Sequence, residues 1–178
     1  MPDGPPLTMD DGVTGLGRIR FLANFMATIL VDQSYKIEQT SHDTAIAAAR
    51  GTETAALVID RRLKRMLVQE FGKRVGGRRI YLWLFAYGAS EVIFDLWQPG
   101  DKVVVDTEYE GSTQLVEDLV ATYLLRKHIR IDRSSISSSR VGRHSLADSI
   151  SRMPWLAAHK RRIDGSQLGR MAKELGLG

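Results

Sequence analysis

The stretch KVVVDTEY, residues 102–109, decides the fold that the sequence predicts. Consecutive valines favour a β-strand that is buried within a sheet. Successive side chains of a strand point to opposite faces, so Val103 and Val105 share one face while Asp106 and Glu108 share the other. The two acids could simply face solvent at the end of the strand. Because they follow three valines, we instead expect two carboxylates to be presented on one side of a sheet.

A second strand that contains an acid precedes this one. Residues 27–38, ATILVDQSYKIE, begin with a β-rich run and place Asp32 near the middle or end of a strand. Two short apolar segments follow, 44–49 and 54–59, and a turn that contains glycine separates them. This pattern predicts a three-stranded antiparallel meander. In such a meander, Asp32 could also be an exposed residue of an edge strand.

Periodic apolar residues predict helices over most of the remaining chain. Asp60 is placed to cap the first of these helices, and Gly76-Gly77 to end it. We expect the helices at about 61–75, 80–97, 113–127, 145–153 and 167–175. Between the third and fourth helices, Ile129 and Ile131 predict a short strand, and the serine-rich residues 134–139 predict a flexible stretch.

Basic residues gather in segments that the small net charge of +4 conceals. Residues 60–79 carry eight bases and two acids, residues 126–143 carry six bases and one acid, and residues 160–162 are all basic. Such clusters are typical of a surface that binds a polyanion, although solvated helix faces have the same composition. The side chains that we expect to bind nucleic acid are Arg61, Arg62, Lys64, Arg65, Arg143, His144, Lys160, Arg161 and Arg162.

The absence of cysteine excludes several kinds of site. The chain can form no disulfide, no thiolate metal site and no cysteine nucleophile, so histidine and carboxylate groups are the metal ligands to consider. His42 and His144 lack the helical spacing of a zinc site. No apolar run approaches a membrane span and no signal-peptide pattern opens the chain, so we expect a cytoplasmic protein without a membrane partner.

The order of predicted elements and the placement of the acids resemble the ribonuclease H-like superfamily, which includes ribonucleases H, Holliday-junction resolvases, integrases and transposases. The resemblance covers about residues 26–152. It implies an α/β fold of three layers, in which a mixed five-stranded sheet is flanked by helices. The domain organisation that follows is a flexible N-terminal arm at 1–20, a catalytic domain at 21–153 and a basic C-terminal helical tail at 154–178.

The resemblance also implies a set of catalytic carboxylates. Asp32 is similar to the acid on the first strand of that fold, and Asp106 to the acid at the end of the fourth strand, with Glu108 as a neighbour or substitute. Asp148, after Ser145, is similar to the acid on a late helix. Asp32, Asp106 and Asp148 would then hold two Mg²⁺ or Mn²⁺ ions. Such ions prefer oxygen ligands and promote the cleavage of phosphodiester bonds.

Two parts of this carboxylate set have alternatives. Asp148 stands three residues after Ser145, so it could simply complete a capping box. The fold often carries a further glutamate on its first long helix, for which Glu70 and Glu91 are both candidates.

The functional expectation is a divalent-metal-dependent nuclease that acts on structured or hybrid nucleic acid. The main alternative is a nucleic-acid-binding module on the same fold that has lost catalysis, and a scaffold domain is a third class. Resolvase-like members of the superfamily often dimerise, which makes a homodimer possible. The sequence does not choose among RNA, DNA and hybrid substrates, or between endonuclease and exonuclease action.

Overall fold

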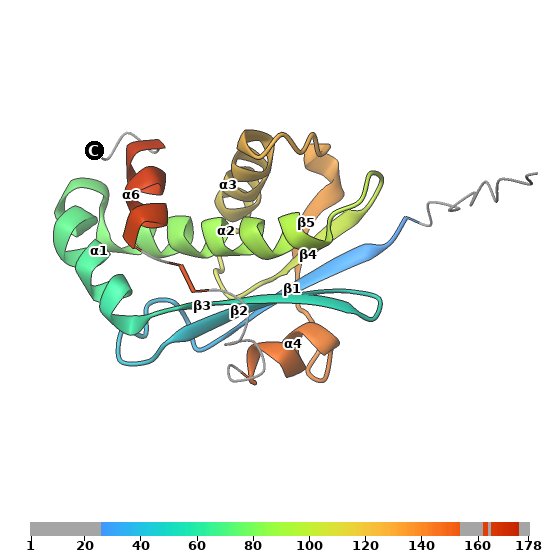
Figure 1. Cartoon of the computed structure of the whole chain (residues 1–178), viewed down its shortest axis with the longest axis horizontal. Helices are drawn as coiled ribbons and strands as arrows, with labels where there is room; N and C mark the ends of the chain where they lie inside the picture. Colours follow the sequence, from blue (N-terminus) through green and yellow to red (C-terminus); the bar gives the residue numbers. More distant parts are fainter. Residues whose placement is uncertain (1–25, 154–161, 164, 175–178) are drawn as a thin grey trace, which may run out of the picture.

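The computed structural model describes residues 26–153, 162–163 and 165–174 of the chain. Its strands are β1 Thr28–Ser34, β2 Thr44–Arg50, β3 Glu53–Ile59, β4 Lys102–Asp106 and β5 Ile136–Ser139. Its helices are α1 Arg61–Val75, α2 Gly77–Leu96, α3 Thr113–Arg126, α4 Leu146–Ser151 and α6 Gly165–Glu174, with a 3₁₀ turn at Arg133–Ser135. The strands form one mixed sheet in the order β3-β2-β1-β4-β5, with helices on both faces (Figure 1). The expected α/β architecture, a five-stranded sheet flanked by helices, is therefore confirmed.

The central pair of strands brings two acids to the same edge of the sheet. Strands β1 and β4 run parallel, with Val31 aligned to Val105. The next residue on each strand is Asp32 or Asp106, so both acids leave the sheet at neighbouring carboxyl ends. Strand β4 ends at Asp106, which is earlier than expected, and Glu108 lies in the turn that follows, where its amide donates to the Asp106 carbonyl at 3.0 Å.

The edge strand β5 differs from the prediction. The strand expected at Ile129 and Ile131 is absent from the described chain at that place, and both residues pack, partly buried, against the core from a connecting segment. Residues 134–139, which were expected to be flexible, instead supply β5, which pairs in parallel with β4 from Ile136 onward. The sequence did not predict this strand because its side chains have no apolar alternation. It is a strand because its backbone forms hydrogen bonds with β4.

The predicted helices are present with small shifts. Asp60 caps α1 by accepting a hydrogen bond from the Arg62 amide at 2.6 Å. Gly76, with a φ of 80°, ends α1 and immediately precedes α2, so α2 begins three residues earlier than expected. The terminal helix α6 is also found, whereas residues 1–20 and most of the segment before α6 lie outside the described residues. No helix of the described chain is long and apolar enough to span a membrane.

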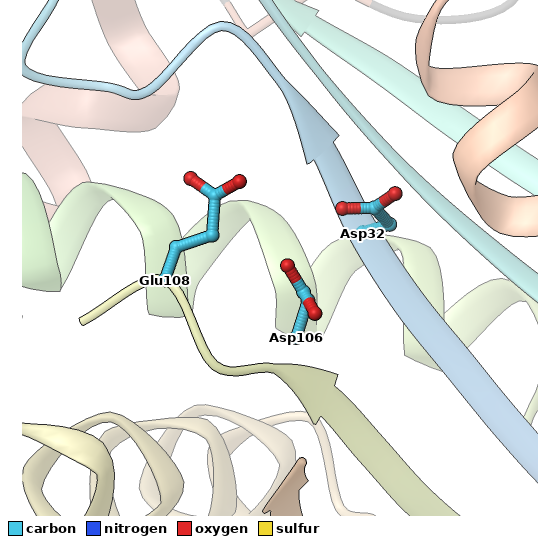
Figure 2. Close-up of side chains that lie close together, drawn as sticks. All are labelled: Asp32, Asp106 and Glu108. Atoms are coloured by element: carbon cyan, nitrogen blue, oxygen red, sulfur yellow. The ribbon is translucent and has the colours of Figure 1, made fainter. Parts of the chain in front are cut away.

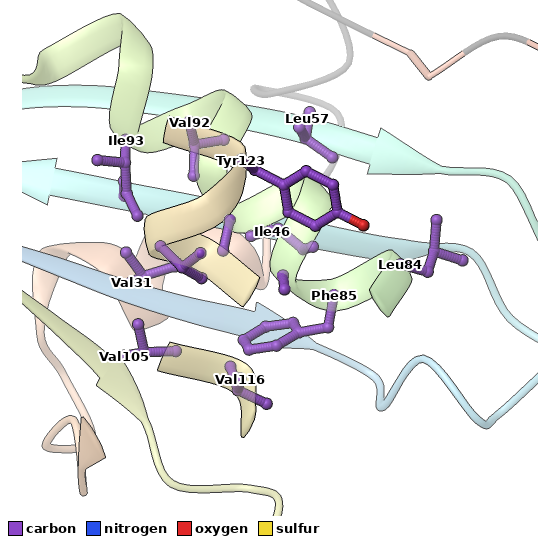
Figure 3. Packing of buried hydrophobic residues seen from close by; sticks show 14 of the residues in the cluster. Val31, Ile46, Leu57, Leu84, Phe85, Val92, Ile93, Val105, Val116 and Tyr123 are labelled. Atoms are coloured by element: carbon purple, nitrogen blue, oxygen red, sulfur yellow. The ribbon is translucent and has the colours of Figure 1, made fainter. Parts of the chain in front are cut away.

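The two faces of the sheet pack against different helices (Figure 1), and Figure 3 shows the larger core cluster, which includes residues of α2 and α3. Ile46 of β2 faces α2, where a Cβ atom at Gly88 would lie only 2.5 Å from its Cδ1, so the glycine allows close packing of helix on sheet. The next residue, Ala47, points the other way and packs with Ala56 and with Ile150 of α4. Since α4 covers the face that also carries Asp32, it is positioned to contribute to a site there.

A buried ion pair holds the opposite ends of the central strands. The Asp101 carboxylate, 1% exposed, accepts hydrogen bonds from Arg50 Nε at 2.7 Å and Nη2 at 3.1 Å. It also accepts from the backbone amides of Ala27 at 3.1 Å and Gln98 at 3.0 Å. Burial raises the pKa of Asp101, but these hydrogen bonds outweigh burial and hold its pKa below the usual range. One carboxylate thus ties β2 and the start of β1 to the turn before β4.

Substitution Asp101→Asn should lower the free energy of unfolding by about 3 kcal/mol at pH 7, because it removes one partner of a buried ion pair. The depressed pKa means that the contribution of Asp101 is complete above its unfolded pKa near 3.8 and is lost as the pH falls further. The difference in unfolding free energy between the wild type and Asp101→Asn, measured by urea denaturation, should therefore be smaller at pH 3 than at pH 7. The matched control is Glu53→Gln, since Glu53 is exposed at 3.7 Å from Arg50 and should contribute less than about 1 kcal/mol. Equal losses in the two variants would contradict the assignment.

Candidate metal centre

Three acids from the carboxyl edge of the sheet converge in the folded chain. Asp32 of β1, Asp106 of β4 and Glu108 each offer a carboxylate oxygen, and these oxygens all lie within 4.8 Å of one another (Figure 2). Asp32 is buried, and the other two side chains are half-buried. Oxygen ligands from several carboxylates at this spacing suit a hard divalent cation such as Mg²⁺ or Mn²⁺. The expected convergence of Asp32 and Asp106 is present in the structure.

Asp148 lies beside this group without belonging to it. It lines the same cavity, and its negative charge acts on Asp32. Its carboxylate accepts hydrogen bonds from Arg152 Nε at 2.7 Å and from the His144 amide at 3.1 Å. The Asp148 amide donates to Ser145 Oγ at 3.0 Å, which is one half of the capping box that the sequence suggested. The other half is not formed, because the Ser145 amide donates to the Gly142 carbonyl. Asp148 therefore takes part in the cap of α4 and also presents a carboxylate to the cavity.

The crowding of the acids changes their protonation. Burial raises the pKa of Asp32 to about 7, against a hydrogen bond from the Gln33 amide, and repulsion from Asp106, Asp148 and Glu108 adds to the increase. Burial also raises the pKa of Glu108, partly opposed by the positive charge of Lys36. A divalent cation would relieve this repulsion, since it favours the ionised form of each ligand. The charges of the cluster therefore favour the binding of a divalent cation.

A hydrogen-bond chain fixes the direction of two acids at the site. Gln33 Nε2 donates to Glu108 Oε2 and to the Tyr109 hydroxyl, both at 3.1 Å. The Tyr109 hydroxyl donates to Glu38 Oε2 at 3.2 Å. Gln33 Oε1 is buried and has no hydrogen-bond partner among the described residues. Tyr109 is itself 5% exposed and packs in the core.

The acids line an open cavity of about 1130 Å³ that also carries five exposed basic side chains, the basic rim. Glu38 and Glu110 extend its acidic side. Gly77 and Arg78 at the start of α2, together with Tyr81, form another wall. The basic side chains that line this cavity are Lys36, Arg78, Arg140, Arg143 and Arg152. Basic side chains thus line the same cavity as the clustered acids, a combination that suits a ligand with phosphate groups and a bound divalent ion.

Comparison of the chain with protein-family models, with curated proteins and with solved structures gives no match.

The basic residues expected to bind nucleic acid are dispersed. Arg143 lines the cavity that contains Asp32, Asp106 and Glu108, called the metal cavity for its candidate ligands. His144 lies exposed in the loop before α4. Arg61, Arg62 and Arg162 are exposed around a second cavity. Arg65 is exposed on α1, whereas Lys160 and Arg161 lie outside the described residues.

Lys64 was wrongly expected to contact nucleic acid. Its side chain is fully buried, and Nζ donates to the Gln39 carbonyl at 2.9 Å and to Thr44 Oγ1 at 2.8 Å. Burial lowers its pKa to about 8, although three nearby acids oppose the change. The surrounding loop encloses this amine, so Lys64 holds the β1–β2 connection and cannot reach a phosphate at the surface.

Neither candidate for a further helical glutamate lines the cavity. Glu70 is exposed on α1, and Glu91 is buried in an ion pair of 2.6 Å with Lys127 that joins α2 to α3. The wall that α2 provides carries Arg78 and Tyr81 instead. Sequence reasoning missed Arg78 because Gly76-Gly77 was interpreted only as a helix end. Arg152 was missed as well, although its position four residues after Asp148 on a predicted helix favours an ion pair.

Substitution Asp32→Asn should stabilise the metal-free protein at pH 8. The pKa of Asp32 is 3.8 in its ordinary state and about 7 in the folded protein. Between pH 3.8 and pH 7 the folded state therefore retains a proton that the unfolded chain releases, so the free energy of unfolding falls as the pH rises. The variant avoids this cost and should unfold with a free energy higher by about 2–4 kcal/mol at pH 8 in chelator. The difference should vanish near pH 4.

Addition of Mg²⁺ or Mn²⁺ should reverse the order of stability, because the wild-type chain gains binding free energy that the Asp32→Asn chain has lost. Thermal denaturation in chelator and in 10-fold steps of metal concentration measures both effects. Glu70→Gln, which changes an exposed acid outside the cavity, is the matched control and should follow the wild type. A destabilised Asp32→Asn variant in chelator at pH 8 would refute the electrostatic account.

Proposed function

We propose that the protein is a divalent-metal-dependent nuclease with a ribonuclease H-like fold. The observation that carries the proposal is the convergence of Asp32, Asp106 and Glu108 within 4.8 Å, in a cavity with a basic rim. The sheet order β3-β2-β1-β4-β5 also supports the proposal. A further support is the position of the acids, since Asp32 lies on the first strand, Asp106 at the end of the fourth strand and Asp148 on a late helix. Mg²⁺ or Mn²⁺ is the cofactor that fits a set of oxygen ligands.

Each acid has a defined part in the proposed reaction. Asp32 and Asp106, on adjacent strands, would hold the cation from the sheet edge, and Gln33 donates a hydrogen bond to Glu108, which would be a further ligand. Asp148 approaches from α4 on the side of Asp32. When bound, the metal would supply activation of the attacking water and stabilisation of the leaving oxygen in a phosphodiester displacement.

The basic rim would position the nucleic acid. Arg78 stands in the first turn of α2, where the partial positive charge of the helix end adds to that of its guanidinium group. Arg140 and Arg143 line the same cavity from the segment between β5 and α4. Such groups bind phosphates without reading sequence, so the proposed interaction weakens as salt rises.

A nucleic-acid-binding module without catalysis is the second candidate. The observation that favours it is that α2 contributes Arg78 and Tyr81 to the cavity, while Glu70 and Glu91 stay away from it. Without a glutamate from this helix, the cavity could bind the phosphates of a nucleic acid and leave its phosphodiester bonds intact. The two candidates differ in whether cleavage accompanies binding.

The purified protein should cleave at least one of an RNA–DNA hybrid, a four-way junction or a single-stranded oligonucleotide in Mg²⁺ or Mn²⁺. Substitution Asp106→Asn should lower the rate by about 100-fold or more, which corresponds to about 2.7 kcal/mol of lost transition-state stabilisation. Glu70→Gln provides the matched control and should retain the wild-type rate. Denaturing gel electrophoresis of end-labelled substrates measures the cleavage.

The outcomes separate the candidates. Cleavage that persists in chelator and in Asp106→Asn would disprove the metal site. Salt-dependent binding without cleavage in either metal would favour the binding module. If no nucleic acid binds at low salt, both candidates fail and a scaffold role gains support.

A further inference from the structure

A second cavity lies on the other side of the β1–β2 connection, residues 35–43. It has a volume of about 720 Å³ and includes Tyr35, His42 and Asp43 from this connection. The same connection contributes Lys36 and Glu38 to the metal cavity. One short segment therefore contributes side chains to both cavities, which places the two cavities next to each other along this connection.

A pair of stacked rings forms the surface of this second cavity. The rings of Tyr35 and His42 are nearly parallel, with an interplanar angle of 7° and 4.7 Å between their centroids. Tyr35 remains 57% exposed, and Ser41 Oγ lies 2.8 Å from His42 Nδ1 and fixes the imidazole. A tyrosine exposed to this degree contributes little to the core. Its ring instead offers a flat surface that another planar group can extend.

The structure holds Tyr35 in an unusual backbone conformation. Its φ is 51°, in the left-handed region that non-glycine residues rarely adopt. Thr44 Oγ1 donates to the Tyr35 carbonyl at 2.9 Å, and the buried ammonium of Lys64 donates to both Thr44 Oγ1 and the Gln39 carbonyl. These bonds connect the strained residue to α1. Strain that the surroundings maintain in this way is typical of functional positions.

Positive charge surrounds the ring pair. Arg61 and Arg62 at the start of α1, together with Arg162, line the cavity and are exposed. Asp43 accepts a hydrogen bond from the Arg61 amide at 2.9 Å, and Asp60 accepts one from the Arg62 amide at 2.6 Å. Asp60 also lies 3.8 Å from the exposed guanidinium group of Arg162, so it offsets part of the positive charge of this cavity. Aromatic rings beside guanidinium groups are the two components of a surface for unpaired nucleotides.

We propose that the Tyr35–His42 pair binds an unpaired base of a nucleic-acid strand whose phosphates contact Arg61, Arg62 and Arg162, next to the metal cavity. The proposal rests on the proposed function and narrows its substrate to nucleic acid with a single-stranded segment. In a continuous duplex, neighbouring bases cover the faces of each base, so a ring pair cannot reach them. An overhang, a loop or a junction exposes such a face.

The test compares oligonucleotide affinities in Ca²⁺, by fluorescence anisotropy, for a blunt duplex and for the same duplex with a six-nucleotide single-stranded overhang. Wild type should bind the overhang substrate more tightly. Substitution Tyr35→Ala should weaken that binding about 5- to 100-fold, the range expected for one lost stacking contact, and should leave binding to the blunt duplex unchanged. Tyr35→Phe retains the ring and should stay within about twofold of wild type.

Two controls keep the result specific. Phe94→Ala removes an exposed aromatic side chain from the far part of α2 and should leave both affinities unchanged. Photocrosslinking of an overhang that carries 5-iodouracil, followed by mass spectrometry, should map to Tyr35 or His42. It provides a readout that does not depend on the folding of a variant.

Failure of this proposal is distinct from failure of the nuclease proposal. If wild type binds nucleic acid but Tyr35→Ala binds the overhang equally well, or if crosslinks map only elsewhere, the ring pair is not a base-binding surface and the nuclease proposal stands. If wild type binds neither oligonucleotide at low salt, both proposals are overturned.

Discussion

The parallel pairing of β1 with β4 is the constraint on which the rest of the structure depends. Because Val31 is aligned with Val105, Asp32 and Asp106 leave the sheet side by side. A shift of the register by one residue would turn one of these acids to the opposite face of the sheet. The Arg50–Asp101 pair, at the other end of the same strands, limits such a shift. An ion pair remote from the cavity thus contributes to the geometry of the acids within it.

The close approach of these acids lowers the stability of the protein when no cation is bound. Burial and mutual repulsion raise the pKa of Asp32 to about 7, so at neutral pH the fold carries a carboxylate that is poorly stabilised. The core between the sheet and α2, with its close contact at Gly88, supplies compensating stability. Stability is commonly sacrificed where groups are arranged for binding or catalysis, and this is consistent with the proposed metal site.

Strand periodicity was sufficient to predict the central part of the molecule, because the valines of β4 and the β-rich run of β1 encode both their burial and the direction of Asp32 and Asp106. It could not predict β5, whose backbone pairs with β4 although its side chains are mostly serine. Nor could it predict that Lys64 is buried, since a lysine on a basic helix is normally exposed and only the β1–β2 connection encloses it. Contacts between segments far apart in sequence decide such cases, and no local pattern records them.

The two outer strands have a consequence for the behaviour of the protein in solution. Unpaired strand edges promote aggregation by pairing with other chains. Here β5 presents only four residues, and β3 is partly covered by Arg162 and Ile163, where the Ile163 amide donates to the Val58 carbonyl at 3.3 Å. A chain truncated before Arg162 would expose more of the β3 edge. Concentrated solutions of such a fragment are therefore expected to form intermolecular β-structure more readily than the full chain.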